Sequence, residues 1–335
     1  MSDLPMMRAV LVDTFGAWNN TRIGEIPRPA VGHDQVLIKS EASALNFPDL
    51  LMMEGKYQVK PRLPFVPGRD VAGTIVAVGD SVTELKVGDR VAAQPHFGAF
   101  AEYVAAPDWT CVKIPDNVNF TDAAASGTVL ATVVGAMKLR ARLAPGDMLL
   151  LTGAAGGVGS VGIQYARHLG AEVVALVSSD EKERICRKLG ASHVLRTDQL
   201  DSSPSALKAA LDAAGIGYVD AVVDVVGGDT FHAALRCLKP GGRYVIVGFA
   251  SGTIPQIPAN YVLVKDLVIL GSTLDRLFKT RDPELVEGLR EAFDALGAGK
   301  IRTQIDQVLP YSRLTEGASR IAERRAIGKI VFQGF

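Results

Sequence analysis

Apolar runs alternate with helix-length segments of mixed polarity from about residue 147 onward. Near-continuous apolar runs of strand length are typical of parallel strands that helices bury on both faces. The runs are Met148–Leu151, Val173–Val177, Val194–Leu195, Val219–Val226, Tyr244–Val247 and Leu267–Leu270. The pattern therefore predicts an α/β domain over residues 123–272, built on a doubly wound, six-stranded parallel sheet.

Residues 1–122 show a different pattern. Short β-type segments, among them Val36–Ile38 and Ala72–Val78, alternate with turns, and ten of the 17 prolines lie before residue 121. This is typical of a compact, barrel-type β domain. After residue 272 we expect a helix from Asp282-Pro283, a strand near 304–309, a helix near 312–325 and a last strand near 329–333. Because these elements are too few for a third domain, residues 273–335 are expected to fold back onto residues 1–122.

The charges of the chain balance. There are 36 Lys and Arg residues against 36 Asp and Glu residues, so no bulk field attracts the protein to nucleic acid or an anionic membrane. The N-terminal segment lacks the apolar core of a signal peptide, and we find no uninterrupted apolar stretch of about 18 to 20 residues for a membrane span. Cys111, Cys186 and Cys237 are far apart and form no CxxC pair, which argues against disulfides and a clustered metal site. We expect a soluble, cytoplasmic protein with no nucleic-acid or membrane partner.

A glycine-rich turn follows the first buried run. In a strand–turn–helix context, glycines let the backbone approach a pyrophosphate, and the helix N-terminus supplies N–H groups and positive potential. The predicted dinucleotide-binding residues are Gly153, Ala155, Gly156, Gly157, Val158 and Gly159. The alternative is a glycine-rich turn that only packs the helix against the strand.

The next predicted strand ends where a dinucleotide's adenosine ribose is read. Ser178, Ser179 and Lys182 stand there, and small hydroxyl residues with a cation suit the 2′-phosphate of NADP. Asp180 and Glu181 lie between them and could instead repel a phosphate or select NAD. The balance predicts NADPH as the cofactor.

Motifs from both parts of the chain resemble one family. They are Ala44-Leu45-Asn46-Phe47-Pro48-Asp49, Gly55-Lys56-Tyr57, Leu63 to Gly73, Asp224 to Gly228, Lys239-Pro240-Gly241-Gly242 and Gly328-Lys329-Ile330-Val331, beside the glycine-rich turn. Over essentially all 335 residues the chain resembles the medium-chain dehydrogenase/reductase superfamily, and within it the zinc-free quinone oxidoreductases. The resemblance implies a Rossmann domain joined to a GroES-like catalytic domain.

The resemblance also implies a site without metal. Zinc alcohol dehydrogenases of this superfamily carry a Cys where this chain has Asn46, and Gly-His-Glu where it has Gly68-Arg69-Asp70. The loop with four Cys for a structural zinc is missing. His96 alone cannot form a zinc site, which usually needs three protein ligands or more.

The same resemblance assigns roles to further residues. Asn46 and Tyr57 match an Asn and a Tyr that line the nicotinamide site, where hydrogen-bond donors would meet the charge that develops on a substrate oxygen. Thr132 and Phe249 are expected along the nicotinamide and Arg324 near the adenosine phosphate, although a helix Thr, a core Phe and a surface Arg are the structural alternatives. Asn46 could simply form a turn, Tyr57 could simply pack, and Asp49 is expected to cap a helix. Thr197 stands where some members have a Tyr over the phosphate.

Three functions follow from these residues. The first is NADPH-dependent, zinc-independent hydride transfer to a quinone or a small α,β-unsaturated carbonyl. The second is an enoyl thioester reductase, with Lys56, Lys60 and Arg62 at the entrance for coenzyme A or carrier protein. The third is an NADPH-binding protein with little turnover. A homodimer is expected as well, because the apolar run Leu267–Leu270 would form an open edge strand.

Overall fold

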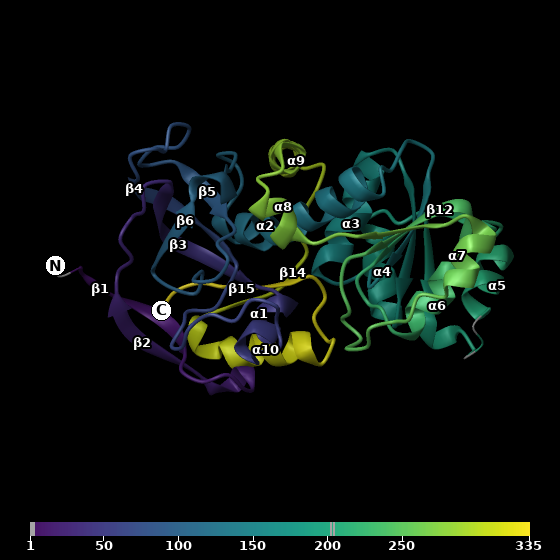
Figure 1. The fold of residues 1–335 in the computed structure, drawn as a ribbon, viewed down its shortest axis with the longest axis horizontal. Helices are drawn as coiled ribbons and strands as arrows, with labels where there is room; N and C mark the ends of the chain where they lie inside the picture. Colours follow the sequence, from purple (N-terminus) through teal and green to yellow (C-terminus); the bar gives the residue numbers. More distant parts are fainter. Residues whose placement is uncertain (1–3, 202, 204) are drawn as a thin grey trace. The chain divides into compact units, whose positions relative to one another are not determined.

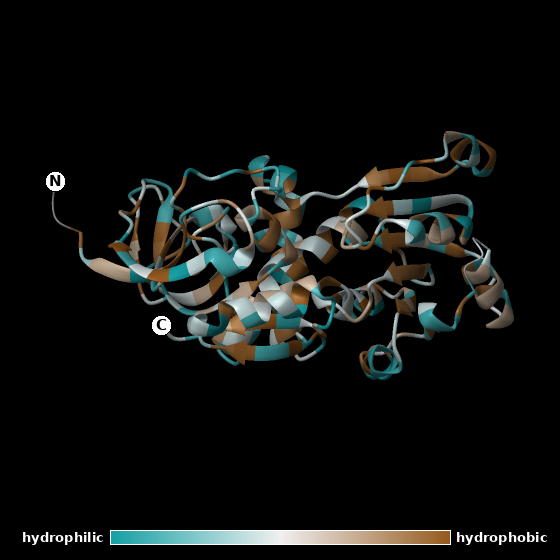
Figure 2. Cartoon of the chain, turned by 90° about the horizontal axis from the view of Figure 1, so that it is seen from below, coloured by the Kyte–Doolittle hydropathy of each residue, from teal (hydrophilic) through white to brown (hydrophobic). Residues whose placement is uncertain are grey.

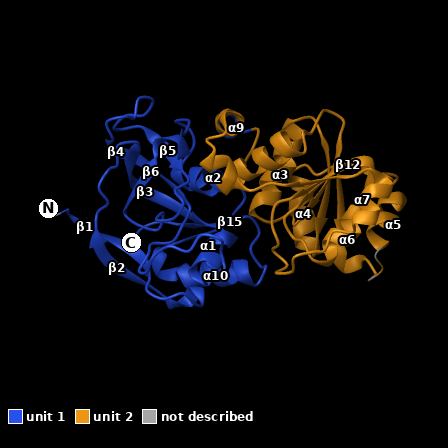
Figure 3. Ribbon diagram, viewed as in Figure 1, with its two compact units in different colours: residues 1–128, 293–299, 303–335 blue, residues 129–292, 300–302 orange. Residues whose placement is uncertain are grey.

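The computed structural model describes residues 4–201, 203 and 205–335. The chain forms two compact units (Figure 3). Unit 1 comprises residues 1–128, 293–299 and 303–335, and unit 2 comprises residues 129–292 and 300–302. Figure 1 labels the elements of each.

Unit 2 contains a six-stranded sheet. Its strands are β8 (Met148–Thr152), β9 (Glu172–Val177), β10 (His193–Arg196), β11 (Val219–Asp224), β12 (Leu238–Ile246) and β13 (Val268–Gly271). All neighbouring strands are parallel, and the order β10-β9-β8-β11-β12-β13 reverses direction at β8. This is the order of a Rossmann sheet, which binds ligands at the carboxyl ends of the strands beside the reversal. The predicted doubly wound, six-stranded α/β sheet is confirmed.

Helices cover the sheet of unit 2. They are α3 (Gly157–His168), α4 (Asp180–Lys188), η4 (Thr197–Gln199), α5 (Ala206–Ala213), α6 (Asp229–Arg236) and α7 (Ala259–Lys265). A further helix, α8 (Leu274–Lys279), follows β13 in the chain. The apolar faces of α5 and α6 share one hydrophobic core with the central strands, as Leu211 and Phe231 do with Val222. Figure 2 shows these strands mostly in hydrophobic colours, as expected for strands buried on both faces.

Unit 1 is built on β-structure. Its strands are β1 (Met6–Val12), β2 (Thr21–Pro27), β3 (Gln35–Leu45), β4 (Asp70–Val78), β5 (Arg90–Ala93), β6 (Tyr103–Pro107), β7 (Cys111–Lys113), β14 (Ile305–Leu309) and β15 (Lys329–Phe332). β1 and β2 form an antiparallel pair, and the other strands form a seven-stranded sheet around the long strand β3. β15 pairs with β3, so the C-terminal segment folds back onto the first domain as predicted. This unit is the GroES-like domain.

Short helices complete unit 1. They are η1 (Trp18–Asn20), α1 (Phe47–Met53), η2 (Asp108–Thr110), η5 (Tyr311–Arg313) and α10 (Leu314–Ala322). Leu50 and Met53 of α1 pack into the same core as Phe100 and Phe332. The core therefore fixes α1 beside the strands that carry the candidate site.

Two helices run through the division between the units. α2 (Phe120–Val133) continues as the π-helix η3 (Val134–Arg140), and α9 covers Pro283–Gly297. Together Phe120–Arg140 is long and apolar enough to cross a membrane by length and composition, contrary to the expectation of no such stretch, and 78% of its apolar window is buried. A largely buried helix of this kind is typical of a protein core.

Two details differ from the sequence prediction. The second domain boundary was expected after residue 272, but residues 273–292 belong to unit 2, where Leu277 approaches Gly135 and Lys138 pairs with Glu291. Lys239-Pro240-Gly241-Gly242 by itself reads as a turn, but it lies inside β12, where the register to β11 shifts. The shift absorbs the left-handed Gly241, with φ of 74°, without ending the strand.

Candidate active site

Asn46 lies in unit 1 where β3 ends and α1 begins. Its backbone N–H donates to Oδ2 of Asp49 at 2.8 Å, so Asp49 caps the N-terminus of α1 as predicted. Asn46 is 7% exposed and Asp49 is fully buried. The cap holds Asn46 at a fixed position on the helix.

The side-chain amide of Asn46 is held on both sides. Nδ2 donates to Asp70 Oδ2 at 2.9 Å and makes a longer contact of 3.4 Å with the carbonyl oxygen of Ala44. Lys329 Nζ donates to Asn46 Oδ1 at 2.5 Å and to the carbonyl of Leu45 at 3.1 Å. These bonds fix which amide atom is N and which is O. A substrate oxygen that accepted from Nδ2 would replace the long contact to Ala44.

Asp70 joins this amide to α2. Its Oδ1 accepts from both the backbone N–H and the hydroxyl of Thr128, each at 2.8 Å. A Cβ at Gly127 would lie 2.6 Å from the same oxygen. Residue 127 must therefore be glycine for the carboxylate of Asp70 to keep this position.

Four charged groups are buried in this part of unit 1. Asp49, Asp70, Arg69 and Lys329 are each at most 8% exposed, and Lys329 Nζ lies 3.5 Å from Asp70 Oδ2. Two acidic and two basic side chains lie together, and their mutual attraction offsets part of the cost of burying each charge. Burial raises the pKa of Asp49 to about 7, against the lowering effect of the N–H of Asn46 and of Arg69. Burial also lowers the pKa of Lys329, against the opposing charges of Asp70 and Asp49.

Tyr57 is connected to the same region through Arg69. Arg69 Nη1 donates to the Tyr57 phenolic oxygen at 2.9 Å, and its guanidinium lies 5.7 Å from the ring centroid. Arg69 holds Tyr57 and Asp70 holds Asn46. Arg69 and Asp70 are consecutive in the chain. The structure therefore brings the two predicted catalytic residues to the start of β4.

The glycine-rich turn of unit 2 lies between β8 and α3, as predicted. Gly153 has a φ of 59°, and a Cβ at Gly159 would lie 2.4 Å from the carbonyl oxygen of Gly153. Gly156 is the N-cap of α3, so Gly157, Val158 and Gly159 form its first turn, where backbone N–H groups lack intrahelical acceptors. Ala155 is buried beneath the turn. The geometry fits a pyrophosphate at the helix N-terminus.

A buried carboxylate fixes the neighbouring loop. Asp224 accepts from the Thr152 hydroxyl at 2.6 Å, from the Tyr244 hydroxyl at 2.8 Å and from the N–H groups of Val226 and Gly227. Burial and the Asp224 charge raise the pKa of Tyr244. The side chain of Val226 would touch a Cβ at Gly153, so Asp224 sets the distance between this loop and the glycine-rich turn.

Ser178, Ser179 and Lys182 lie together after β9. Lys182 Nζ donates to Ser178 Oγ at 3.2 Å, and Ser179 caps α4 by accepting from the Lys182 N–H at 3.4 Å. The Asp180 carboxylate accepts from Arg184 at 3.1 Å and from Arg196 at 3.3 Å. The carboxylate that could repel a phosphate is thus engaged by two guanidinium groups.

The remaining predicted cofactor residues divide between the units. Phe249 of unit 2 would meet a Cβ at Gly227 at 2.9 Å, so it lies beside the loop that Asp224 fixes. Thr132 is 8% exposed on α2. Arg324 belongs to unit 1, where it follows α10 with a φ of 58°. Within unit 2 the structure brings Phe249 to the same loop region as the turn.

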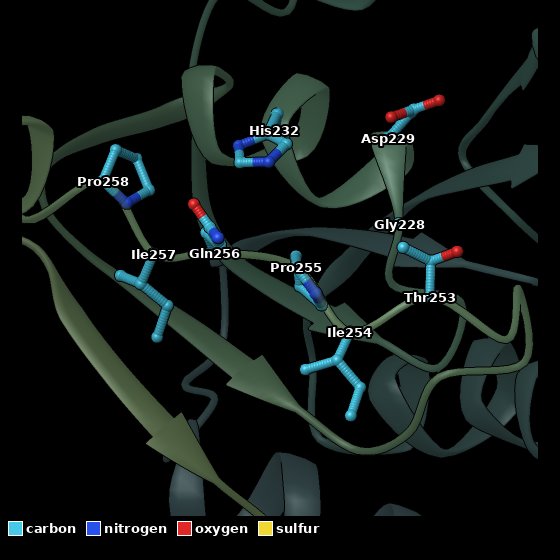
Figure 4. A pocket seen from close by; sticks show the side chains of 9 residues that line it. All are labelled: Gly228, Asp229, His232, Thr253, Ile254, Pro255, Gln256, Ile257 and Pro258. Atoms are coloured by element: carbon cyan, nitrogen blue, oxygen red, sulfur yellow. The ribbon is translucent and has the colours of Figure 1, made fainter.

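Among the described residues, no group of three or more His, Cys, Asp or Glu side chains could hold a metal ion. A pocket of about 360 Å³ lies elsewhere in unit 2, between the start of α6 and the segment before α7 (Figure 4). It is lined by Gly228, Asp229, His232, Thr253, Ile254, Pro255, Gln256, Ile257 and Pro258. None of these is a predicted site residue.

Sequence reasoning missed the partners of Asn46. Lys329 and Asp70 were noted as parts of motifs, and Thr128 was not noted. The available signal for Lys329 was a lysine directly before the apolar run Ile330-Val331-Phe332. A charged residue in a buried strand usually has a buried partner.

Comparison with known proteins agrees with this geometry. A family model for the alcohol dehydrogenase GroES-like domain matches residues 32–116, and one for zinc-binding dehydrogenase matches residues 157–291. Quinone oxidoreductase-like protein 2 of Bos taurus is 34% identical, over 91% of this chain and 86% of its own. A 2-haloacrylate reductase of a Burkholderia species is 30% identical, over 97% of this chain and 98% of its own. The solved structure of the Escherichia coli quinone oxidoreductase complexed with NADPH is 26% identical and has a TM-score of 0.89. The match covers 98% of this chain and 100% of that one.

The chain belongs to the medium-chain dehydrogenase/reductase superfamily, as its motifs predicted. It is an NAD(P)-dependent oxidoreductase of that superfamily, with quinone oxidoreductases among its relatives.

Proposed function

We propose that this protein is an NADPH-dependent, zinc-independent reductase of quinones or small α,β-unsaturated carbonyls. The observation that carries the proposal is the hydrogen-bonded group of Asn46, Asp70 and Lys329. A bound nicotinamide nucleotide supplies the hydride. The protein's own residues must then meet the charge that develops on the substrate oxygen.

The residues at the metal positions favour chemistry without zinc. Asn46 and Asp70 accept or donate hydrogen bonds within the chain, and an ammonium group lies against both. Arg69, at the position of a ligating His, is a cation. Quinones and enones suit such a site because the charge formed on reduction is delocalised and needs less stabilisation than an alkoxide. The quinone oxidoreductase and 2-haloacrylate reductase relatives carry names of these two substrate classes.

The adenosine end favours NADPH over NADH. Lys182 and Ser178 would bind the 2′-phosphate, and Asp180 is paired with Arg184 and with Arg196, which also pairs with Asp198. Thr197 donates its hydroxyl to the Val177 carbonyl at 3.1 Å, so it is not expected to replace the Tyr of other members. The Escherichia coli relative was solved with NADPH.

An enoyl thioester reductase is the second candidate. The bond from Arg69 to Tyr57 favours it, because a positioned Tyr could donate the proton that a thioester enolate requires. A basic entrance would include Lys56, whose side chain is 70% exposed and pairs with Glu54.

A homodimer through β13 is part of the proposal. β13 is an edge strand of the six-stranded sheet, and open edges present unpaired backbone groups to a second chain. Exposed apolar side chains surround this edge, including Val268 at 45%, Leu263 at 81% and Val264 at 82%. Antiparallel pairing of two β13 strands across a two-fold axis would cover them.

The test is NADPH oxidation by the purified protein, followed with a benzoquinone, a small enone, an enoyl thioester and a simple ketone. We expect turnover of the quinone or enone to exceed that of the ketone by at least tenfold and to survive prolonged chelation. Activity that is lost on chelation and restored by zinc would contradict the proposal. Tight NADPH binding without turnover of any substrate would favour a cofactor-binding protein instead.

A further inference from the structure

Arg69 is a buried cation that forms a hydrogen bond with Tyr57, one of the two predicted catalytic residues. A guanidinium that is 8% exposed donates to the Tyr57 phenolic oxygen at 2.9 Å. Burying a cation is costly, and an apolar residue at this position would pack without that cost. The attraction of Asp49 offsets part of that cost, and the bond to Tyr57 gives the guanidinium a further role at this site.

We propose that Arg69 is a positioning residue that activates Tyr57 as the proton donor of the reduction, an inference that rests on the proposed function. Arginine only donates hydrogen bonds. The bond from Arg69 thus occupies a lone pair of the phenolic oxygen, and the phenolic proton is left to point toward another acceptor.

The pairing lowers the cost of losing that proton. A cation that donates to a phenolic oxygen stabilises the phenolate more than the phenol, since the bond to the anion is charge-assisted. Arginine itself stays protonated throughout. The pair is therefore suited to release a proton and to hold the resulting negative charge.

A bound nicotinamide nucleotide would supply the hydride, and the reduced substrate would then carry an electron pair as an enolate or quinol anion. The O–H bond of Tyr57 breaks, the proton forms a bond to the substrate oxygen, and the electron pair of the broken bond remains on the phenolate. Arg69 stabilises this phenolate until water returns a proton to it.

Other charges surround Arg69 and must be considered in a test. Asp49 of α1 interacts electrostatically with Arg69, Asp70 follows it in the chain, and Lys329 of β15 lies against Asp70. Changing Arg69 alters the field of these groups too. The measurement must therefore report on Tyr57 itself.

The experiment compares Arg69→Gln, Arg69→Lys and Tyr57→Phe, singly and with Arg69→Gln and Tyr57→Phe combined. Arg22→Gln, which removes an exposed pairing with Asp13, is the control. The phenolate absorbance of Tyr57 is followed against pH in the full-length protein, with the Tyr57→Phe protein as the blank. Circular dichroism checks that each variant is folded.

We expect Arg69→Gln to move the titration midpoint of Tyr57 upward by about one pH unit or more. Arg69→Lys, which keeps the charge, should move it less. Turnover should fall by about tenfold or more in Arg69→Gln. It should fall no further when Arg69→Gln is added to Tyr57→Phe, since the two residues act through one step. Arg22→Gln should change neither the midpoint nor the turnover.

An unmoved midpoint in Arg69→Gln, or additive losses in the combined variant, would overturn the role of Arg69. If Arg69→Gln does not fold, Arg69→Lys is compared with a short peptide that contains Tyr57. Equal titration midpoints of Tyr57 in the protein and in the peptide would overturn the role of Arg69 equally. Failure of the proposed function has a different signature: the wild-type protein would reduce no quinone, enone or thioester, which would overturn the donor role whatever the midpoint.

Discussion

Asp49→Asn is expected to make the stability of the protein less dependent on pH. The Asp49 carboxyl is fully buried, its Oδ2 accepts from the Asn46 N–H, and its Oδ1 has no hydrogen-bond partner among the described residues. Burial therefore raises its pKa from 3.8 to about 7. An asparagine keeps an acceptor for the Asn46 N–H and removes the charge.

The sign of the effect follows from proton binding. Between about pH 4 and pH 7 the unfolded chain has lost the proton that the folded chain still holds, so the folded state loses stability as pH rises. Each pH unit in that window costs about 1.4 kcal/mol. Because the folded carboxyl itself begins to ionise near pH 7, the loss levels off there: it amounts to about 4 kcal/mol in full and to about 2 kcal/mol between pH 5 and pH 7.

The assay is reversible urea unfolding of the wild-type protein and Asp49→Asn at pH 5, 6 and 7. The free energy of unfolding of Asp49→Asn, relative to that of the wild-type protein, should increase as pH rises. Lys329 is present in both proteins, so its own titration contributes to both curves. Asp116→Asn, which changes an exposed carboxyl, should give a curve parallel to wild type. A constant difference between wild type and Asp49→Asn over this range would refute the reasoning.

Three further predictions concern the cofactor and the assembly. Lys182→Ala should weaken NADPH binding by about 1.5 to 3 kcal/mol and NADH binding far less, measured by fluorescence titration; equal losses would argue against the 2′-phosphate contact. Gly159→Ala should weaken both nucleotides in the same titration, because its Cβ would lie 2.4 Å from the Gly153 carbonyl oxygen; unchanged binding would show that the turn does not hold the pyrophosphate. Val268→Asp should convert a dimer to a monomer in analytical ultracentrifugation, whereas Val308→Asp, at the similarly exposed Val308 of β14, should not; a monomeric wild type would remove the basis of this prediction.

The fold of unit 2 was predictable because its signal is local. Strands such as β8 and β11 are buried on both faces, so each reads as an apolar run without knowledge of its neighbours. The helices between them are marked by glycine and by capping residues. The bulge in β12 was not predictable, because a shifted register is a property of two strands and Lys239-Pro240-Gly241-Gly242 by itself reads as a turn.

The candidate site was predictable only in part. Asn46 and Tyr57 entered through a resemblance of motifs, since a single Asn or Tyr in a loop carries no signal of its own. Their partners depend on tertiary structure: β15 pairs Ile330 with Leu45, and that register alone brings Lys329 to the residue after Leu45. No spacing along the chain expresses a contact across 283 positions.

This register explains why the C-terminal segment belongs to the catalytic unit. Asp70 is buried, and a buried carboxylate that loses its cation costs about 3 to 5 kcal/mol. Lys329 lies 3.5 Å from it and also holds the Asn46 amide, so the last strand supplies both the compensating charge and the orientation of a predicted catalytic side chain. The ammonium is part of the chain itself, so the pairing of β15 and of β4 with β3 assembles this part of the site.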